Sequence, residues 1–266
     1  LPSNLLFGLS ALLSMLPAAI LGLRHAPASG GLFWTLIAVA VAGPSAYAAA
    51  QLLQGALPSL STALWLSVSA SLVVYFVISI AVPAARRLTP LLLPYLLLMA
   101  AGALVASAAP ERGLQFPAPA AWLDLHVAVS LATYGLLTLA AVAGFAVLMQ
   151  EGALKRKQPT ALTRALPSAA DGERLQVRLL AVTEAVLGIG VITGIGTQYV
   201  ATGQMLNLDH KTLLSFLALA VIGGLLVVHH RTGLRGRRAA RVILVAYLLL
   251  TLAYPGVKFV TDVLLG

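Results

Sequence analysis

The sequence predicts an all-α, polytopic membrane protein with eight transmembrane helices and both termini on the outer, periplasmic side. Of its 266 residues, 60% are hydrophobic and only 9% are charged, whereas about a quarter of a soluble domain is charged. The mean hydropathy is +0.96. Apolar runs of about 20 residues, the length that crosses ~30 Å of hydrocarbon, recur along the chain. These observations together exclude an ordinary soluble protein.

Each apolar run is expected to form one membrane-spanning helix, and the runs follow one another without a soluble linker. The predicted spans are 3–23, 32–52, 60–82, 89–108, 121–149, 177–200, 211–230 and 240–261. We therefore expect a single integral membrane domain over residues 1–266. Its first part, 1–110, supplies four helices with few diagnostic residues, and its second part, 120–266, supplies four helices that carry the candidate site.

Lysine and arginine set the expected orientation, because cytoplasmic connections of membrane proteins are enriched in both. Of the 17 basic residues, all but Arg112, Lys211 and Lys258 flank the odd-numbered connections. This places the odd connections in the cytoplasm of a bacterium and the chain in its inner membrane. The net charge of +9 is then a topogenic signal and an attraction to anionic lipid. Nucleic acid is not an expected partner.

The sequence lacks the residues that several common kinds of catalytic and metal-binding site require. The chain has no cysteine, which excludes disulfides, thiolate catalysis and cysteine-bound metal clusters. A Ser/His/Asp set, a P-loop and a pair of catalytic carboxylates cannot be assembled either. We therefore predict no catalytic residue.

The segment from Trp122 to Tyr134 places a histidine about one turn inside a span that otherwise suits lipid. His126, Ser130 and Tyr134 are spaced i, i+4 and i+8, so they are expected on one face of the helix. A ring nitrogen in hydrocarbon needs a partner, and an ionisable group inside a membrane helix indicates function by default. The alternative is a core histidine that bonds a neighbouring hydroxyl.

His210 stands at the outer mouth of the seventh span, on the side from which His126 is predicted to enter the membrane. The two imidazoles could converge as axial ligands of haem iron in an apolar pocket. Lys211 or Arg112 could then meet the propionates, since an ammonium suits an anionic group. The alternative makes His210 a solvated residue beside a helix cap at Asp209. Zinc is less favoured, because too few further ligands lie on that side.

Three further features are secondary candidates. Glu184 is a carboxylate well inside a span and could be protonated, paired with a histidine, part of a proton path or extended to the interface. The glycine-rich run 188–196 lacks the dinucleotide fingerprint and favours close helix packing instead. His229 and His230, with His25, could form a ligand site on the inner side or simply end their helices in water.

The second half resembles the cytochrome c assembly family, which includes CcsA, CcmC and HemX. The resemblance rests on Trp122–Tyr134, on Glu173–Gly194, on Asp209–Thr212, on Gly233–Arg238 and on Tyr254–Val260, and the HemX/YpjD-like branch fits best. It implies a protein that handles haem in the membrane, with His126 as the first outer-side haem histidine.

The sequence also departs from that family. Residues 201–210 contain no tryptophan, although the family has a tryptophan-rich haem loop there, and no histidine follows the last span. His210 is the candidate replacement. We therefore expect a protein that holds haem b by two histidines, with cytochrome c maturation or haem-pathway membrane proteins as partners, rather than a complete synthetase. The alternatives are a small proton-coupled transporter that uses Glu184 and a haem-free assembly or regulatory subunit.

Overall fold

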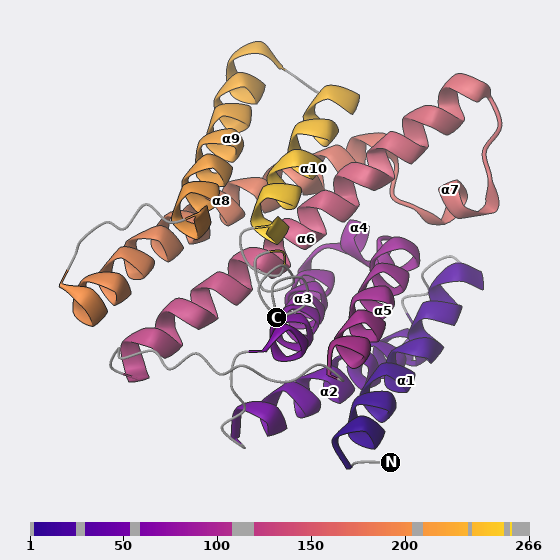
Figure 1. The fold of residues 1–266 in the computed structure, drawn as a ribbon. Coiled ribbons are helices and arrows are strands. Elements are labelled where there is room, and N and C mark those ends of the chain that lie inside the picture. The colour runs from indigo at the N-terminus through magenta and orange to yellow at the C-terminus, as the bar shows by residue number, and fades with distance from the viewer. Residues whose placement is uncertain are drawn as a thin grey trace.

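The computed structural model describes residues 3–24, 30–53, 59–107, 120–203, 210–233, 236–252 and 256. Every regular element within these ranges is a helix (Figure 1). Seven of the described helices are long and apolar enough to cross a membrane. The prediction of an all-α, polytopic membrane protein is confirmed.

The first half forms a cluster of four long helices, α1 (Ser3–Arg24), α2 (Gly31–Leu53), α3 (Leu60–Ala81) and α5 (Thr89–Ala106). α1 packs on α2 and α5, and α3 packs on the same two helices. Bulky side chains fill the centre, among them Trp65 and Tyr75, both fully buried. The short α4 (Pro83–Arg86) begins at a proline, whose fixed backbone angle and missing N–H suit the first turn of a helix.

The second half contains α6 (Ala120–Arg156), the short α7 (Ala161–Ala165), α8 (Ala169–Thr202), α9 (His210–Thr232) and α10 (Arg237–Thr251). α6 packs on α8, α8 on α9, α9 on α10 and α10 again on α6. α6 also packs on α3, so one hydrophobic core runs through both halves. An ion pair between Glu151 and Arg237, at 3.4 Å, ties the end of α6 to the start of α10.

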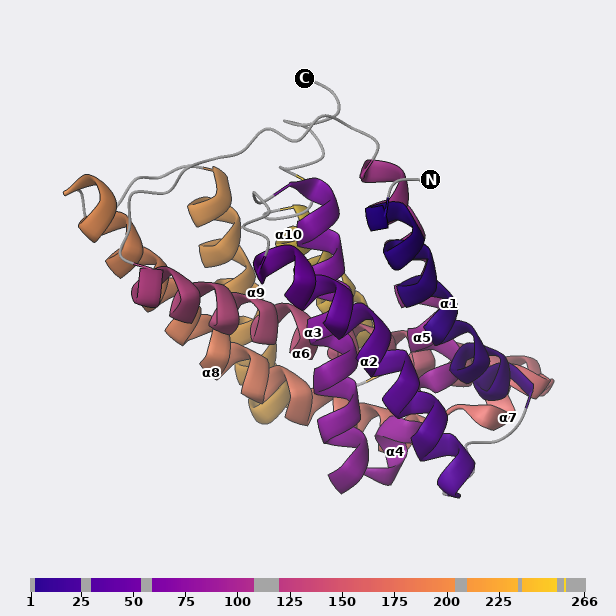
Figure 2. The same cartoon turned by 90° about the horizontal axis from the view of Figure 1, so that it is seen from below.

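α6 and α8 are much longer than the spans expected from the sequence. They contain 37 and 34 residues, or about 55 and 51 Å at 1.5 Å per residue, and they run obliquely to the first-half helices (Figure 2). α8 begins eight residues before the predicted span 177–200, because the Ser168 side chain accepts a hydrogen bond from the Asp171 amide and caps the helix there. Hydropathy marks the part of a helix that suits lipid, whereas caps decide where the helix begins.

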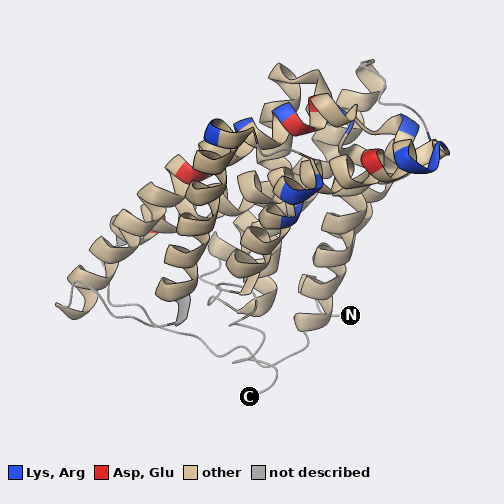
Figure 3. Ribbon diagram, turned by 90° about the horizontal axis from the view of Figure 1, so that it is seen from above, with Lys and Arg blue, Asp and Glu red and all other residues tan. Residues whose placement is uncertain are grey.

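Lysine and arginine gather at one end of the bundle, around α4 and α7 and at the starts of α8 and α10 (Figure 3). We call this the basic end; the start of α6, the end of α8 and the start of α9 form the far end. The separation agrees with the charge alternation in the sequence, but the side of the membrane on which each end lies stays a prediction. The count of eight spans also stays a prediction, since the span 240–261 is described only to 252 and at 256.

Candidate functional site

At the far end, the rings of Trp122 and His126 on α6 pack against the glycine-rich stretch of α8. His126 lies over Gly194, where a Cβ atom would come within 3.0 Å of the ring carbon Cε1. Trp122 lies over Gly196, where a Cβ would come within 2.7 Å of Cζ2. Gly190, Gly194 and Gly196 thus form a surface for close packing against α6, as the GxxxG pattern indicates. Gly194 and Gly196 have no side chain, and this leaves room for the two rings against α8.

Thr193 connects these two side chains. Its hydroxyl donates to the Gly190 carbonyl at 3.0 Å and lies 3.0 Å from Nδ1 of His126. Its own carbonyl oxygen accepts a hydrogen bond from Nε1 of Trp122 at 3.2 Å and another from the Thr197 hydroxyl at 2.8 Å. Thr193 is buried, so these bonds form largely out of contact with solvent.

The Thr193 hydroxyl bears on the tautomer of His126. A threonine hydroxyl has one hydrogen, so it cannot donate to the Gly190 carbonyl and to Nδ1 of His126 at the same time. When it donates to the carbonyl it accepts from the ring, which places the ring proton on Nδ1 and leaves Nε2 with a lone pair. A neutral imidazole whose other nitrogen donates to a fixed partner is the form that ligates a metal. The ring is partly exposed rather than enclosed.

Ser130 and Tyr134 follow His126 on α6 but have different surroundings. Ser130 is exposed. Tyr134 is buried, and its hydroxyl bonds that of Tyr247 on α10 at 3.0 Å. The Tyr247 hydroxyl also bonds those of Tyr95 on α5 and Thr138 on α6. Tyr134 thus belongs to a buried cluster of hydroxyl groups that joins three helices, and it is not brought together with His126.

The partners predicted for His126 lie outside what the structure describes. His210 begins α9 at the far end, but the side chains of His210 and Lys211 are not among the described ones, and neither is any part of Arg112, Asp209 or His25. α9 packs on α8 and α10 but is not extensively packed on α6 in the described ranges. α6 and α9 therefore stand at opposite corners of the second-half cluster.

Glu184 lies near the middle of α8 and faces α9. Its Oε1 would be 2.7 Å from a Cβ at Gly223, so the carboxyl group sits against the backbone of that glycine. Its Oε2 is buried without a hydrogen-bond partner in the described part of the chain. Among the described residues, no histidine lies within hydrogen-bond distance of this oxygen. A protonated state, a proton path and extension to the interface stay predictions.

His229 and His230 end α9 at the basic end, away from His126. Their rings meet edge to face with centroids 5.6 Å apart, and Nδ1 of His230 lies 2.8 Å from the Leu226 carbonyl oxygen. The described residues contain no group of three or more His, Asp or Glu side chains that could hold a metal ion.

Comparison with known proteins identifies the family of this chain. The family model described as cytochrome C assembly protein matches residues 31–265. The chain belongs to the cytochrome c assembly family. The match begins at α2 and so extends well before residue 120, where the resemblance seen in the sequence begins. The HemX/YpjD-like branch stays a prediction.

One similar relative of this member of the cytochrome c assembly family comes from Azospirillum brasilense. It is an uncharacterized 28.8 kDa protein in the nifR3-like 5′ region, 50% identical over 268 residues and aligned over 99% of each chain. The family, together with the membrane helices, indicates a role in cytochrome c biogenesis or haem handling by a multi-pass membrane protein.

The sequence identified His126 and Trp122 but not the role of Thr193. The signal was present in part, since Thr193 lies between Gly190 and Gly194 in the stretch that was expected to pack closely. What the sequence did not contain was the register between α6 and α8, which decides that Thr193 meets the imidazole.

Proposed function

We propose that this protein holds b-type haem at the far end of the bundle and handles it for cytochrome c biogenesis in the bacterial inner membrane. His126 is the proposed axial ligand from α6, and His210, at the start of α9, is the proposed second ligand. Lys211 and Arg112 are proposed to meet the propionates. Orientation by the positive-inside rule makes the far end the periplasmic one.

The observation that carries the proposal is the hydrogen bond between His126 and Thr193. Histidine ligands of metals usually donate their second ring N–H to a fixed acceptor, which holds the tautomer and the ring orientation. The Thr193 hydroxyl, 3.0 Å from Nδ1 of His126, is the acceptor that we propose. Membership of the cytochrome c assembly family supports haem as the ligand rather than another metal.

The donor set fits haem better than a bare metal ion. Haem iron requires only one or two protein ligands because the porphyrin supplies four nitrogens, whereas a structural zinc site needs four. Trp122 and Ser130 lie one turn before and one turn after His126 and are the neighbours proposed to line the haem. Tyr134, also predicted on this face, bonds Tyr247 in the buried hydroxyl cluster, and we propose no contact between it and the haem.

An absorbance spectrum of the detergent-purified full chain, after addition of haemin and dithionite, tests the proposal. We expect a Soret band with sharp α and β bands on reduction, and its loss in His126→Ala and His210→Ala. His230→Ala is the matched control, because this histidine lies at the basic end and should leave the spectrum unchanged. A wild-type protein without a Soret band, or equal spectra for all three variants, would overturn the proposal.

The same preparations separate the two rival functions. A proton-coupled transporter predicts no haem spectrum and pH-dependent uptake that disappears in Glu184→Gln. Within the described part of the chain Oε2 of Glu184 is buried without a hydrogen-bond partner, and this observation favours that reading. A haem-free assembly subunit predicts neither a spectrum nor uptake, with cytochrome c maturation proteins recovered alongside the chain.

A further inference from the structure

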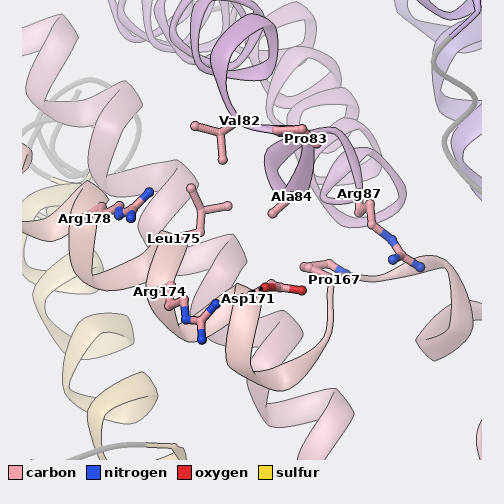
Figure 4. A pocket seen from close by; sticks show the side chains of 9 residues that line it. All are labelled: Val82, Pro83, Ala84, Arg87, Pro167, Asp171, Arg174, Leu175 and Arg178. Atoms are coloured by element: carbon pink, nitrogen blue, oxygen red, sulfur yellow. Dashed lines mark ion pairs between the residues drawn. The ribbon is translucent and has the colours of Figure 1, made fainter.

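A pocket opens at the basic end, between the turn that joins α3 to α5 and the beginning of α8 (Figure 4). Its volume is about 420 Å³. It lies at the end of the bundle opposite His126 and has no part in the proposed haem site. The residues that line it are Val82, Pro83, Ala84, Arg87, Pro167, Asp171, Arg174, Leu175 and Arg178.

The charged part of the lining is strongly basic. Arg174 and Arg178 are one turn apart on α8, and Arg87 lies on the other side of the pocket, beyond Pro167 (Figure 4). Asp171 is the single acid among the nine lining residues. Its carboxylate already accepts a hydrogen bond from the Ser168 hydroxyl at 2.7 Å and pairs with Arg174 at 3.9 Å. Three guanidinium groups against one carboxylate leave the pocket with an excess of positive charge.

Arg87 is held in a fixed position. Its Nε donates to the Ala165 carbonyl at 3.2 Å and its Nη2 to the Arg164 carbonyl at 2.9 Å. The same connecting segment is held from α6 by Gln150, whose Nε2 donates to the carbonyls of Thr163 and Pro167 at 2.7 and 2.9 Å. These bonds hold the Arg87 guanidinium against the connecting segment, on the outer side of the pocket wall (Figure 4).

The rest of the lining is apolar, from the end of α3 and from Leu175 on α8. A pocket with apolar walls and arginine side chains, at the level where basic residues meet the membrane surface, suits an amphipathic anion. Arginine binds phosphate oxygens well because its planar donors match them. Basic pockets between transmembrane helices on the cytoplasmic side are typical binding places for anionic headgroups.

We propose that this pocket binds a phosphate-bearing anion, namely the headgroup of an anionic phospholipid from the adjacent leaflet. Arg174 and Arg178 are the phosphate contacts, and Val82, Pro83 and Leu175 meet the glycerol and upper acyl region. Arg87 adds positive charge from the opposite wall of the pocket. The lipid then bridges α8 to the turn between α3 and α5, which belong to different halves of the chain.

The test is a binding titration of the full chain in a neutral detergent with dioctanoyl phosphatidylglycerol, dioctanoyl phosphatidylcholine and inorganic phosphate. We expect the anionic phosphatidylglycerol to bind about tenfold more tightly than the zwitterionic phosphatidylcholine. Arg174→Gln with Arg178→Gln should remove that preference. Lys155→Gln with Arg156→Gln is the matched control, since it removes the same charge from exposed positions at the end of α6, outside the pocket.

Each outcome decides the proposal. A preference that survives in the Arg174/Arg178 variant, or that is lost equally in the control variant, overturns it, because the attraction then belongs to the general basic surface. Displacement of the lipid by inorganic phosphate at equal concentration overturns the lipid source and identifies free phosphate as the ligand. Equal binding of the two lipids, with an acidic protein partner recovered through the same arginines, overturns it in favour of a protein interface.

Discussion

Thr193→Val is the sharpest test of how the candidate site is built. Valine has the shape of threonine without the hydroxyl, so the packing of α6 on α8 is retained. Two hydrogen bonds are lost, the one between the hydroxyl and Nδ1 of His126 and the one to the Gly190 carbonyl, both 3.0 Å long. The imidazole then loses the side-chain partner that is proposed to hold its proton on Nδ1, and the proton can move to Nε2, the nitrogen needed for ligation.

The expected loss of haem affinity in Thr193→Val can be judged from other hydrogen-bond partners of metal-ligating histidines. Removal of the group that orients a metal-ligating histidine usually weakens binding by about 10- to 100-fold, or about 1.4–2.7 kcal/mol. His126 is partly exposed, and water can replace the lost acceptor in part. We therefore expect the lower half of this range, about 10- to 30-fold in the dissociation constant for haem.

The assay is a titration of haem-free protein with haemin, followed at the Soret band. Thr193→Ser retains the hydroxyl and should bind haem nearly as the wild type does. Thr197→Val removes a hydroxyl one turn later that donates to the Thr193 carbonyl and leaves the Thr193 hydroxyl in place, so it should also change little. Equal losses in Thr193→Val and Thr193→Ser, or no loss in either, would show that the hydroxyl does not set the tautomer.

Three other substitutions test the packing and the buried polar groups. Gly196→Ala places a Cβ 2.7 Å from the Trp122 ring and should weaken haem binding in the same titration, whereas Gly188→Ala meets nothing within 4 Å and should not. Tyr247→Phe leaves the hydroxyls of Tyr95 and Tyr134 without their shared partner and should lower the unfolding free energy by about 1–3 kcal/mol. Tyr199→Phe, at an exposed position, is the control and should be neutral. Equal melting temperatures for the two variants would contradict this. Glu184→Met replaces a carboxyl group with a buried oxygen that has no hydrogen-bond partner among the described residues, and it should raise the melting temperature. Glu151→Met breaks the ion pair with Arg237 and should lower it. A drop in both variants would show that Glu184 has a stabilising partner.

The fold could be predicted from the sequence because lipid imposes one dominant rule. Every backbone polar group in hydrocarbon must be satisfied within its own segment, so long apolar runs become helices. The expected spans 60–82 and 89–108 correspond closely to α3 and α5. The extended ends of α6 and α8 could not be predicted in this way, since they depend on the Ser168 cap and on the connecting segment held by Gln150.

The candidate site could be predicted only as far as single helices allow. His126 was identified because an imidazole is unusual in an apolar run, and Gly190 and Gly194 because their spacing favours close packing. Helical spacing alone also grouped Tyr134 with His126, yet α10 brings Tyr247 to Tyr134, and α8 brings Thr193 to His126. Spacing along a helix gives the angle of a side chain but not the neighbouring helix that it meets.

α8 carries both proposed sites, and its length keeps them apart. Thr193 follows Arg174 by 19 positions in the sequence, which is about 28 Å along a helix and close to the thickness of the hydrocarbon core. The haem proposed at His126, beside Thr193, and the headgroup proposed at Arg174 therefore lie near opposite ends of α8. Substitutions more than 10 Å apart that share no partners usually have additive effects. We therefore expect a substitution at one end of α8 to weaken either haem binding or headgroup binding, but not both. A loss of both after a substitution at one end would show that the two sites are coupled through α8.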